Sequence, residues 1–309
     1  MKTKITIPVL LIGFNRPEVI KQSFDYIRKA KPEKLYIMID GAREGKIGED
    51  KLVEEVKEVV KNIDWECEAY YKFNEKNMGA EITVSSGISW VFETEEYAII
   101  LEDDIVAPLS FFKFAQEMLE KYKHDDRIYM VSSCNQTPIK LPNNEDYLFS
   151  RYGHTWGWAT WKRAWDKFDL NINDFDNYLS NSTLKSLTDT RKERTYYKKL
   201  LTWMKNKGAG NNNWDYCWWY IRFKEQALSI VPRNHLSSNI GVYGLHARGQ
   251  NESHYRPYDD EFIVTKYPKH IDRNVAYDKH HFKNHINKKK CLIVRMFNRI
   301  IRVLHNFLK

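Results

Sequence analysis

Short apolar runs alternate with amphipathic segments along the first 135 residues. The runs at 5–14, 35–39 and 97–101 are rich in aliphatic residues and free of charge, which is typical of strands buried on both faces of a parallel sheet. Between them, segment 52–60 repeats apolar residues at helical spacing. This alternation predicts an α/β fold, with a mostly parallel sheet and helices on both faces.

The second half of the chain has a less regular pattern. Segment 136–155 is polar and interrupted by two prolines, so we expect a loop there. The aromatic segment 154–161 leads into a helix-like stretch that ends at about residue 168, a further helix is expected from Trp214, and 228–231 favours a short strand. Beyond residue 249 the pattern does not define elements.

The last eighteen residues again show a clear helical period of apolar and basic positions. Apolar and basic positions separate onto opposite faces over 292–309, directly after Lys288–Lys290. A basic amphipathic helix of this kind suits an anionic membrane surface or a partner groove. Packing of the helix against its own domain explains the pattern equally well.

Composition and charge say more about where the protein resides than about what it does. The 309 residues carry a net charge of +8, which favours an anionic partner or reflects a lysine-rich surface without one. The four cysteines are far apart and lack paired metal spacing, so we expect reduced thiols, a cytoplasmic protein and no zinc cluster.

Three consecutive acids follow the apolar run at 97–101. Glu102, Asp103 and Asp104 repel one another, so a cation or several hydrogen-bond donors must lie near them. Ligands of open α/β sheets bind beyond the carboxyl ends of strands, where these acids lie. Their oxygen atoms suit Mn²⁺ or Mg²⁺. The simpler alternative is a solvated acidic turn.

Polar groups also follow the other predicted strands. Asn15 and Arg16 follow the first strand, and Asp40 follows the second. Asn77 and Gly79 follow a third strand, which alternating apolar residues predict at 67–73. Each alone is typical of a turn, but together they predict a pocket along one edge of the sheet. Neither a glycine-rich dinucleotide loop nor a Walker loop is present, which disfavours a Rossmann dehydrogenase or a P-loop enzyme.

Segment 99–108, followed by Phe111 and Phe112, resembles the Glu-Asp-Asp segment of the N-acetylglucosaminyltransferase I family. These are inverting, metal-dependent glycosyltransferases of the GT-A fold. Further similarities, in chain order, are to the family's nucleotide-binding turns (Asn15-Arg16 and Asp40-Gly41), its acceptor-side segment (Gly157-Trp158 with Trp161) and its helix and following loop (Trp214-Asp215, Trp218, Pro232, Ser237 and Gly241).

The resemblance implies a role for each matched residue. Asp104 would bind the metal, Asp215 would be the catalytic base, and Arg16 with Asp40 would hold a uracil base. Implied donor-side residues are Asn15, Arg16, Asp40, Asn77, Gly79, Glu102 and Asp103, implied acceptor-side residues are Trp156, Gly157, Trp158 and Trp214, and His246 and Arg248 are candidate diphosphate contacts. The chain lacks the histidine with which the family contacts the diphosphate, and 166–213 has no clear counterpart.

The resemblance therefore implies an enzyme that moves a sugar from a nucleotide-diphosphate donor, expected to be a UDP-sugar, to a glycan or lipid-linked acceptor. Residues 1–135 would bind the donor, 136–250 would form the acceptor-binding and catalytic half of the same domain, and 251–309 would be an extension. The alternatives are a sugar-nucleotide nucleotidyltransferase and a catalytically silent protein that binds glycans or nucleic acid. Nucleic acid is the least favoured of these ligands.

Overall fold

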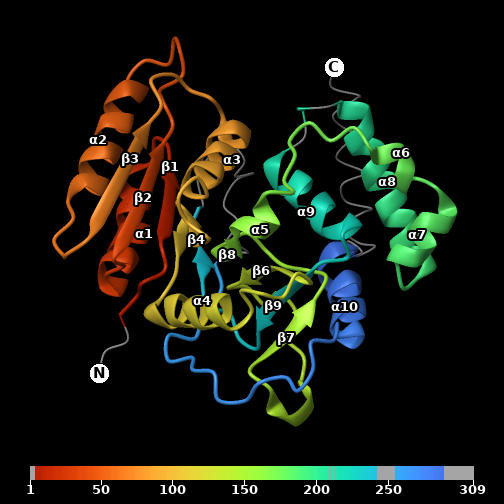
Figure 1. Cartoon of the computed structure of the whole chain (residues 1–309). Coiled ribbons are helices and arrows are strands. Elements are labelled where there is room, and N and C mark those ends of the chain that lie inside the picture. The colour runs from red at the N-terminus through yellow and green to blue at the C-terminus, as the bar shows by residue number, and fades with distance from the viewer. Residues whose placement is uncertain (1–3, 209, 212, 242–254, 289–309) are drawn as a thin grey trace, which may run out of the picture.

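The computed structural model describes residues 4–208, 210–211, 213–241 and 255–288, and its centre is an eight-stranded sheet (Figure 1). The strand order is β3-β2-β1-β4-β8-β6-β9-β7. Strand β8 runs antiparallel to β4 and β6, β7 runs antiparallel to β9, and the remaining pairs are parallel. The strands are β1 (Val9–Gly13), β2 (Lys34–Ile39), β3 (Glu68–Phe73), β4 (Tyr97–Glu102), β6 (Ile128–Ser132), β7 (Tyr147–Ser150), β8 (Trp158–Trp161) and β9 (Leu228–Pro232).

Helices cover both faces of the sheet, as predicted. Alternate residues of β1 show this directly, because Val9 and Leu11 pack with α1, α2 and α4, whereas Leu10 and Ile12 pack with the cluster that contains α3, α5, α8 and α9. The helices are α1 (Pro17–Ala30), α2 (Glu49–Lys61), α3 (Ala80–Val91), α4 (Leu109–Lys121), α5 (Lys162–Trp165), α6 (Phe175–Tyr178), α7 (Asn181–Leu187), α8 (Arg191–Lys207), α9 (Trp214–Lys224) and α10 (Val275–His281). The architecture is consistent with a Rossmann-like nucleotide-diphospho-sugar transferase fold.

One prediction for the middle of the chain is wrong, and one strand was not predicted. The segment 136–155, predicted to be a loop, contains the edge strand β7. The segment 154–161, for which no element was predicted, contains β8, and the helix-like stretch expected after it begins with α5. Both strands are only four residues long and buried at every position, so they lack the period-2 alternation that identifies a half-exposed strand. Pairing with β4 and β6, which precede β8 at a distance in the sequence, determines the conformation of β8.

A second, two-stranded sheet places the segment 238–241 beside Glu102–Asp104, the acidic turn. Strand β10 (Ser238–Asn239) pairs antiparallel with β5 (Ile105–Val106). Directly after β10, the backbone N–H of Ile240 donates to the carbonyl oxygen of Asp104 at 2.8 Å. The chain around Gly241 is therefore held beside Asp104.

The C-terminal part of the described chain packs on the sheet through α10, which continues into a short π-helix, η3 (Phe282–Ile286). The predicted amphipathic helix at 292–309, and the candidate residues His246 and Arg248, lie outside the described residues. Within the described ranges, no helix combines the length and the apolar character needed to cross a bilayer. Three of the cysteines, Cys67, Cys134 and Cys217, are free thiols.

Candidate active site

Arg16 connects the end of β1 to the acids that follow β4. Its Nε donates to Asp103 Oδ2 at 3.1 Å, and its Nη2 pairs with Asp103 Oδ1 and, at 3.2 Å, with Asp104 Oδ2. Parallel pairing of β1 with β4 aligns the two strand ends, so these residues meet although 86 positions separate Arg16 and Glu102. In this state the guanidinium of Arg16 is directed to the carboxylates. Its expected contact with a nucleobase stays a prediction.

Arg16 does not offset the burial and mutual repulsion of the acids in this turn. Burial, followed by the charges of Asp104, Asp103 and Asp215, raises the pKa of Glu102 to about 8. Burial also raises the pKa of Asp103 to about 6, against the opposing effect of Arg16. A bound cation would favour the ionised form of both carboxyls, and carboxylate oxygens are a suitable donor set for a hard divalent cation.

Gly241 lies against the carboxylate of Asp104. A Cβ atom at position 241 would lie 2.3 Å from Asp104 Oδ2, so a side chain there would displace the carboxylate or the loop. The Gly241 N–H donates to Asn239 Oδ1 at 2.8 Å, which fixes this turn. The close approach explains why glycine is required at a position that the sequence marked only through the family resemblance.

Asp40 organises the loop that follows β3. Its two carboxylate oxygens accept five hydrogen bonds, from the backbone N–H groups of Gly41, Met78 and Gly79 and from the side-chain amides of Asn74 and Asn77, at 2.9–3.0 Å. Gly79 has φ +78° immediately before α3, a backbone conformation that other residues rarely adopt. Three residues predicted at separate strand ends, Asp40, Asn77 and Gly79, therefore form one bonded unit.

Asp215 is the second residue of α9 and approaches the acidic turn from the other half of the chain. Its charge contributes to the raised pKa of Glu102, after burial and the charges of Asp104 and Asp103. Asp215 also lines a cavity of about 320 Å³ between α8, α9 and α10. The two acidic parts of the predicted site thus interact electrostatically.

The predicted acceptor-side residues contribute mainly to packing. Trp158 is fully buried and stacks on Trp214 with a centroid distance of 6.1 Å, so neither face of Trp158 is open to an acceptor in this structure. The Trp156 carbonyl accepts from Ser133 Oγ at 2.7 Å and Ser237 Oγ at 2.8 Å. Gly157 has φ +78°, and a Cβ there would lie 3.2 Å from the side chain of Ile105. These residues join β8 to the strands that flank the acidic turn.

Sequence reasoning missed several polar residues that line the Asp215 cavity, among them Arg222, His154, His281 and His285. Arg222 is 4% exposed, and its Nη1 donates to Ser229 Oγ at 2.8 Å, while its Nε has no hydrogen-bond partner. Burial lowers the pKa of Arg222 to about 10. No local pattern marks these residues, because distant segments bring them together.

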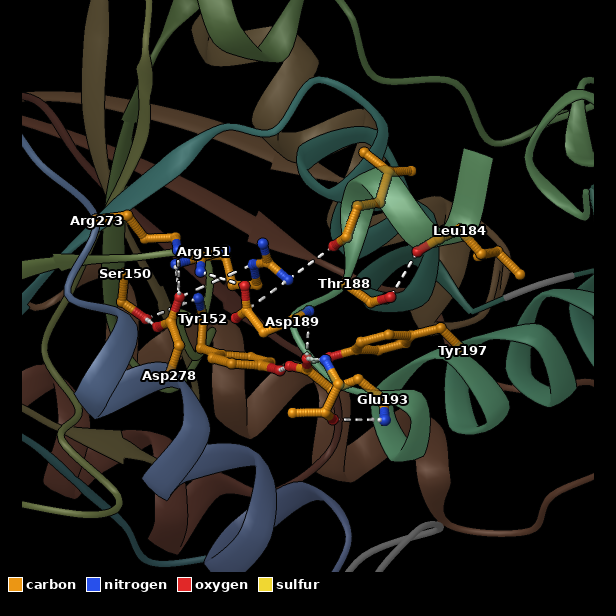
Figure 2. Close-up of polar contacts among 12 residues, drawn as sticks. Ser150, Arg151, Tyr152, Leu184, Thr188, Asp189, Glu193, Tyr197, Arg273 and Asp278 are labelled. Carbon is orange, nitrogen blue, oxygen red and sulfur yellow. Dashed lines mark hydrogen bonds and ion pairs between the residues drawn. The ribbon is translucent and has the colours of Figure 1, made fainter. Parts of the chain in front are cut away.

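A buried polar network supports the wall of this cavity (Figure 2). Asp278 of α10 accepts from Ser150 Oγ of β7 at 2.5 Å and pairs with Arg273 Nε at 3.4 Å. Arg273 also donates to Asp189 at 2.6 Å, just before α8. Tyr152 donates to Glu193 of α8 at 3.0 Å, which completes a connection between β7, α8 and α10.

Comparison with known proteins gives similarity in structure only. No family model matches the sequence, and no curated protein matches it. A solved structure of the mannosyltransferase PcManGT from Pyrobaculum calidifontis, in complex with GDP-Man and Mn²⁺, is 14% identical with a TM-score of 0.32, over 50% of this chain and 44% of the mannosyltransferase. HddC from Yersinia pseudotuberculosis is 8% identical with a TM-score of 0.32, over 51% of this chain and 78% of HddC.

A second structure of HddC, complexed with GMP-PN, is 10% identical over the same shares of the two chains. At these TM-scores the similarities support no conclusion about activity. This chain spans less than half of the mannosyltransferase. None of the three structures is named as an N-acetylglucosaminyltransferase, so that family resemblance rests on the sequence motifs alone.

Proposed function

We propose that this protein is an inverting, metal-dependent glycosyltransferase that uses a nucleotide-diphosphate sugar. The observation that carries the proposal is the acidic turn after β4, where Arg16 bonds Asp103 and Asp104 and Gly241 lies against the carboxylate of Asp104. An inverting displacement needs a base on one side of the sugar ring and stabilisation of the leaving diphosphate on the other. The acidic turn would serve the diphosphate, and Asp215, at the start of α9, would be the base by the family resemblance.

The donor would bind along the strand ends of residues 1–135. Arg16 and the loop ordered by Asp40 border the site for the base and ribose, by resemblance uridine, and Glu102 and Asp103 would face the sugar. The acceptor half would be residues 136–250, with Asp215 taking the proton from the attacking hydroxyl. Such general-base assistance is worth roughly 10²–10⁴-fold.

The acidic turn is suited to hold Mn²⁺ or Mg²⁺ through Asp104. The fit rests on the three adjacent carboxyl groups and their oxygen donors, of which one arginine, Arg16, bonds two. When bound, the ion would supply charge neutralisation to the diphosphate. The close approach of Gly241 and the backbone hydrogen bond from Ile240 to Asp104 fix the turn that carries Asp104, and would thereby position the ion.

A thermal-shift screen of UDP- and GDP-sugars with Mn²⁺, each with and without chelator, tests the proposal. We expect at least one donor to raise the melting temperature in a metal-dependent manner, because a ligand that binds only the native state stabilises it. Asp104→Ala should abolish the metal-dependent part of the shift, and Asp126→Ala, at an exposed position, should retain it. Stabilisation by nucleoside triphosphates alone would instead indicate a nucleotidyltransferase. Equal shifts in Asp104→Ala would contradict the metal assignment.

We further propose a peripheral contact between residues 288–309 and the anionic inner face of a membrane, which carries lipid-linked acceptors. The support is the basic and apolar pattern of the sequence. Truncation after Asn287 should reduce co-sedimentation with anionic vesicles while leaving the circular dichroism melting curve unchanged. Unchanged vesicle binding would contradict the membrane contact and favour packing of this segment against its own domain.

A further inference from the structure

Three histidines from two distant segments converge on the cavity that Asp215 lines. His154 lies between β7 and β8, His281 ends α10, and His285 lies in η3. One ring nitrogen from each histidine can be chosen so that all three nitrogens lie within 4.8 Å of one another. No acidic side chain belongs to this group, so it differs in chemistry from the acidic turn.

The closest pair already has the spacing of two ligands on one metal ion. The Nε2 atoms of His154 and His281 are 3.3 Å apart. In a tetrahedral zinc site with Zn–N bonds of about 2.0–2.1 Å, two nitrogen ligands lie about 3.3–3.4 Å apart. His285 contacts both rings, with centroid distances of 4.9 Å to His154 and 4.9 Å to His281.

The surroundings orient His281 for this role. Its Nδ1 lies 3.0 Å from Thr137 Oγ1, and when Nδ1–H donates to that hydroxyl, the lone pair of Nε2 faces His154. The rings of Tyr152 and Tyr277 pack against the imidazole at 4.8 Å and 5.6 Å, which holds its plane. Hydrogen bonding of the second ring nitrogen is the usual way in which proteins fix a metal-binding histidine.

We propose that His154, His281 and His285 bind a zinc ion, whose fourth coordination position opens into the Asp215 cavity. Three imidazoles suit a borderline metal such as Zn²⁺, whereas Mg²⁺ and Mn²⁺ prefer the oxygen atoms of the acidic turn. Arg222 lines the same cavity, and its positive charge favours an anionic oxygen as the fourth ligand. The ion would connect α10 and η3 to the loop before β8, and so brace the cavity.

The test uses the full-length, tag-free protein stripped of metal, in excess Mg²⁺ to occupy oxygen sites. Titration calorimetry with Zn²⁺ should give one tight site per chain, and Co²⁺ should produce the visible absorption bands of a four-coordinate ion. His154→Ala and His285→Ala should each lower zinc affinity at least about tenfold. His280→Ala, at an exposed neighbour on α10, should bind zinc as the wild type does.

We expect Asp104→Asn to bind zinc as the wild type does. Loss of zinc binding in this variant would show that the acidic turn holds the ion, and would contradict the proposal. His281→Ala is avoided because His281 is fully buried and its removal would disturb folding. Circular dichroism of each variant is the control for folding, and we expect the remaining substitutions to leave the fold intact. Absence of a zinc site in the wild-type chain, or wild-type affinity in folded His285→Ala, would overturn the proposal. Neither outcome depends on transferase activity.

Discussion

Neighbouring carboxylates of the candidate site have different environments. Asp40 is satisfied by five donors of its own loop, Asp103 is paired with Arg16, and Glu102 is buried among like charges. Strand alternation predicts that Glu102 and Asp104 share one face and that Asp103 points to the other. Arg16 bonds both Asp103 and Asp104, so its contacts do not distinguish the two faces.

At the residue scale, Asp215→Asn separates binding from chemistry. The amide keeps the size and position of the side chain but cannot accept the acceptor proton, so we expect donor binding to persist and transfer to fall roughly 10²-fold or more. Initial rates with a donor identified in the screen, together with calorimetric donor affinity, measure both properties. Asp166→Asn, which changes an exposed acid, is the matched control. Near-normal turnover in Asp215→Asn would show that Asp215 is not the catalytic base.

At the scale of elements, the carboxyl ends of parallel strands gather the donor-side residues. Paired strands β1, β2 and β4 end at the same edge, which made Arg16, Asp40 and the acidic turn predictable as neighbours. The wall of the cavity that Asp215 lines was not predictable in this way. It depends on how α8 and α10 pack against β7. The hydrogen bonds and ion pairs that fix this packing, drawn in Figure 2, join residues up to 128 positions apart.

This packing gives a prediction for the network in Figure 2. Arg273→Ala removes one partner each from Asp189 and the fully buried Asp278, which keep their longer contacts with Arg151. We expect the free energy of unfolding to fall by about 1–3 kcal/mol, because each of these acceptors loses one of its donors. Urea unfolding followed by circular dichroism measures the change. Arg127→Ala, whose side chain is 60% exposed and paired with Asp125, should change stability by less than about 1 kcal/mol.

At the scale of the whole molecule, the buried acids make stability depend on pH. The folded pKa of Glu102, about 8, exceeds its ordinary value of 4.5, and that of Asp278, about 7, exceeds 3.8. Each of these two carboxyls keeps its proton in the folded protein at pH values where the unfolded chain has lost it. The buried histidines His154, His235 and His281 act in the opposite direction below about pH 6.5, because burial lowers their pKa and only the unfolded chain binds their protons there. The free energy of unfolding should therefore fall as pH rises from about 6.5 to about 8 in metal-free buffer.

The variant Glu102→Gln tests this linkage without a change of size. The amide carries no charge, so it should stabilise the metal-free protein at pH 8 by about 1 kcal/mol or more, since one pKa unit corresponds to about 1.4 kcal/mol. The gain should vanish near pH 4.5. Urea midpoints across this range, with chelator present, provide the measurement, and Glu58→Gln is the exposed control. A pH-independent difference would show that the charge of Glu102 is not responsible.

The sequence by itself determined the layered α/β architecture of the first 135 residues and the acidic turn after β4. Period and local residue type suffice there, because the centres of β1, β2 and β4 are apolar runs and α1 and α2 each have an apolar stripe. Only the tertiary structure decided that β8 is a strand, that Trp158 is core, and that Asp215 approaches Glu102. It also brought together His154, His281 and His285, where cysteine and histidine spacing had predicted no zinc cluster. Such groups form by contacts between segments that are remote along the chain, and local periodicity carries no information about those contacts.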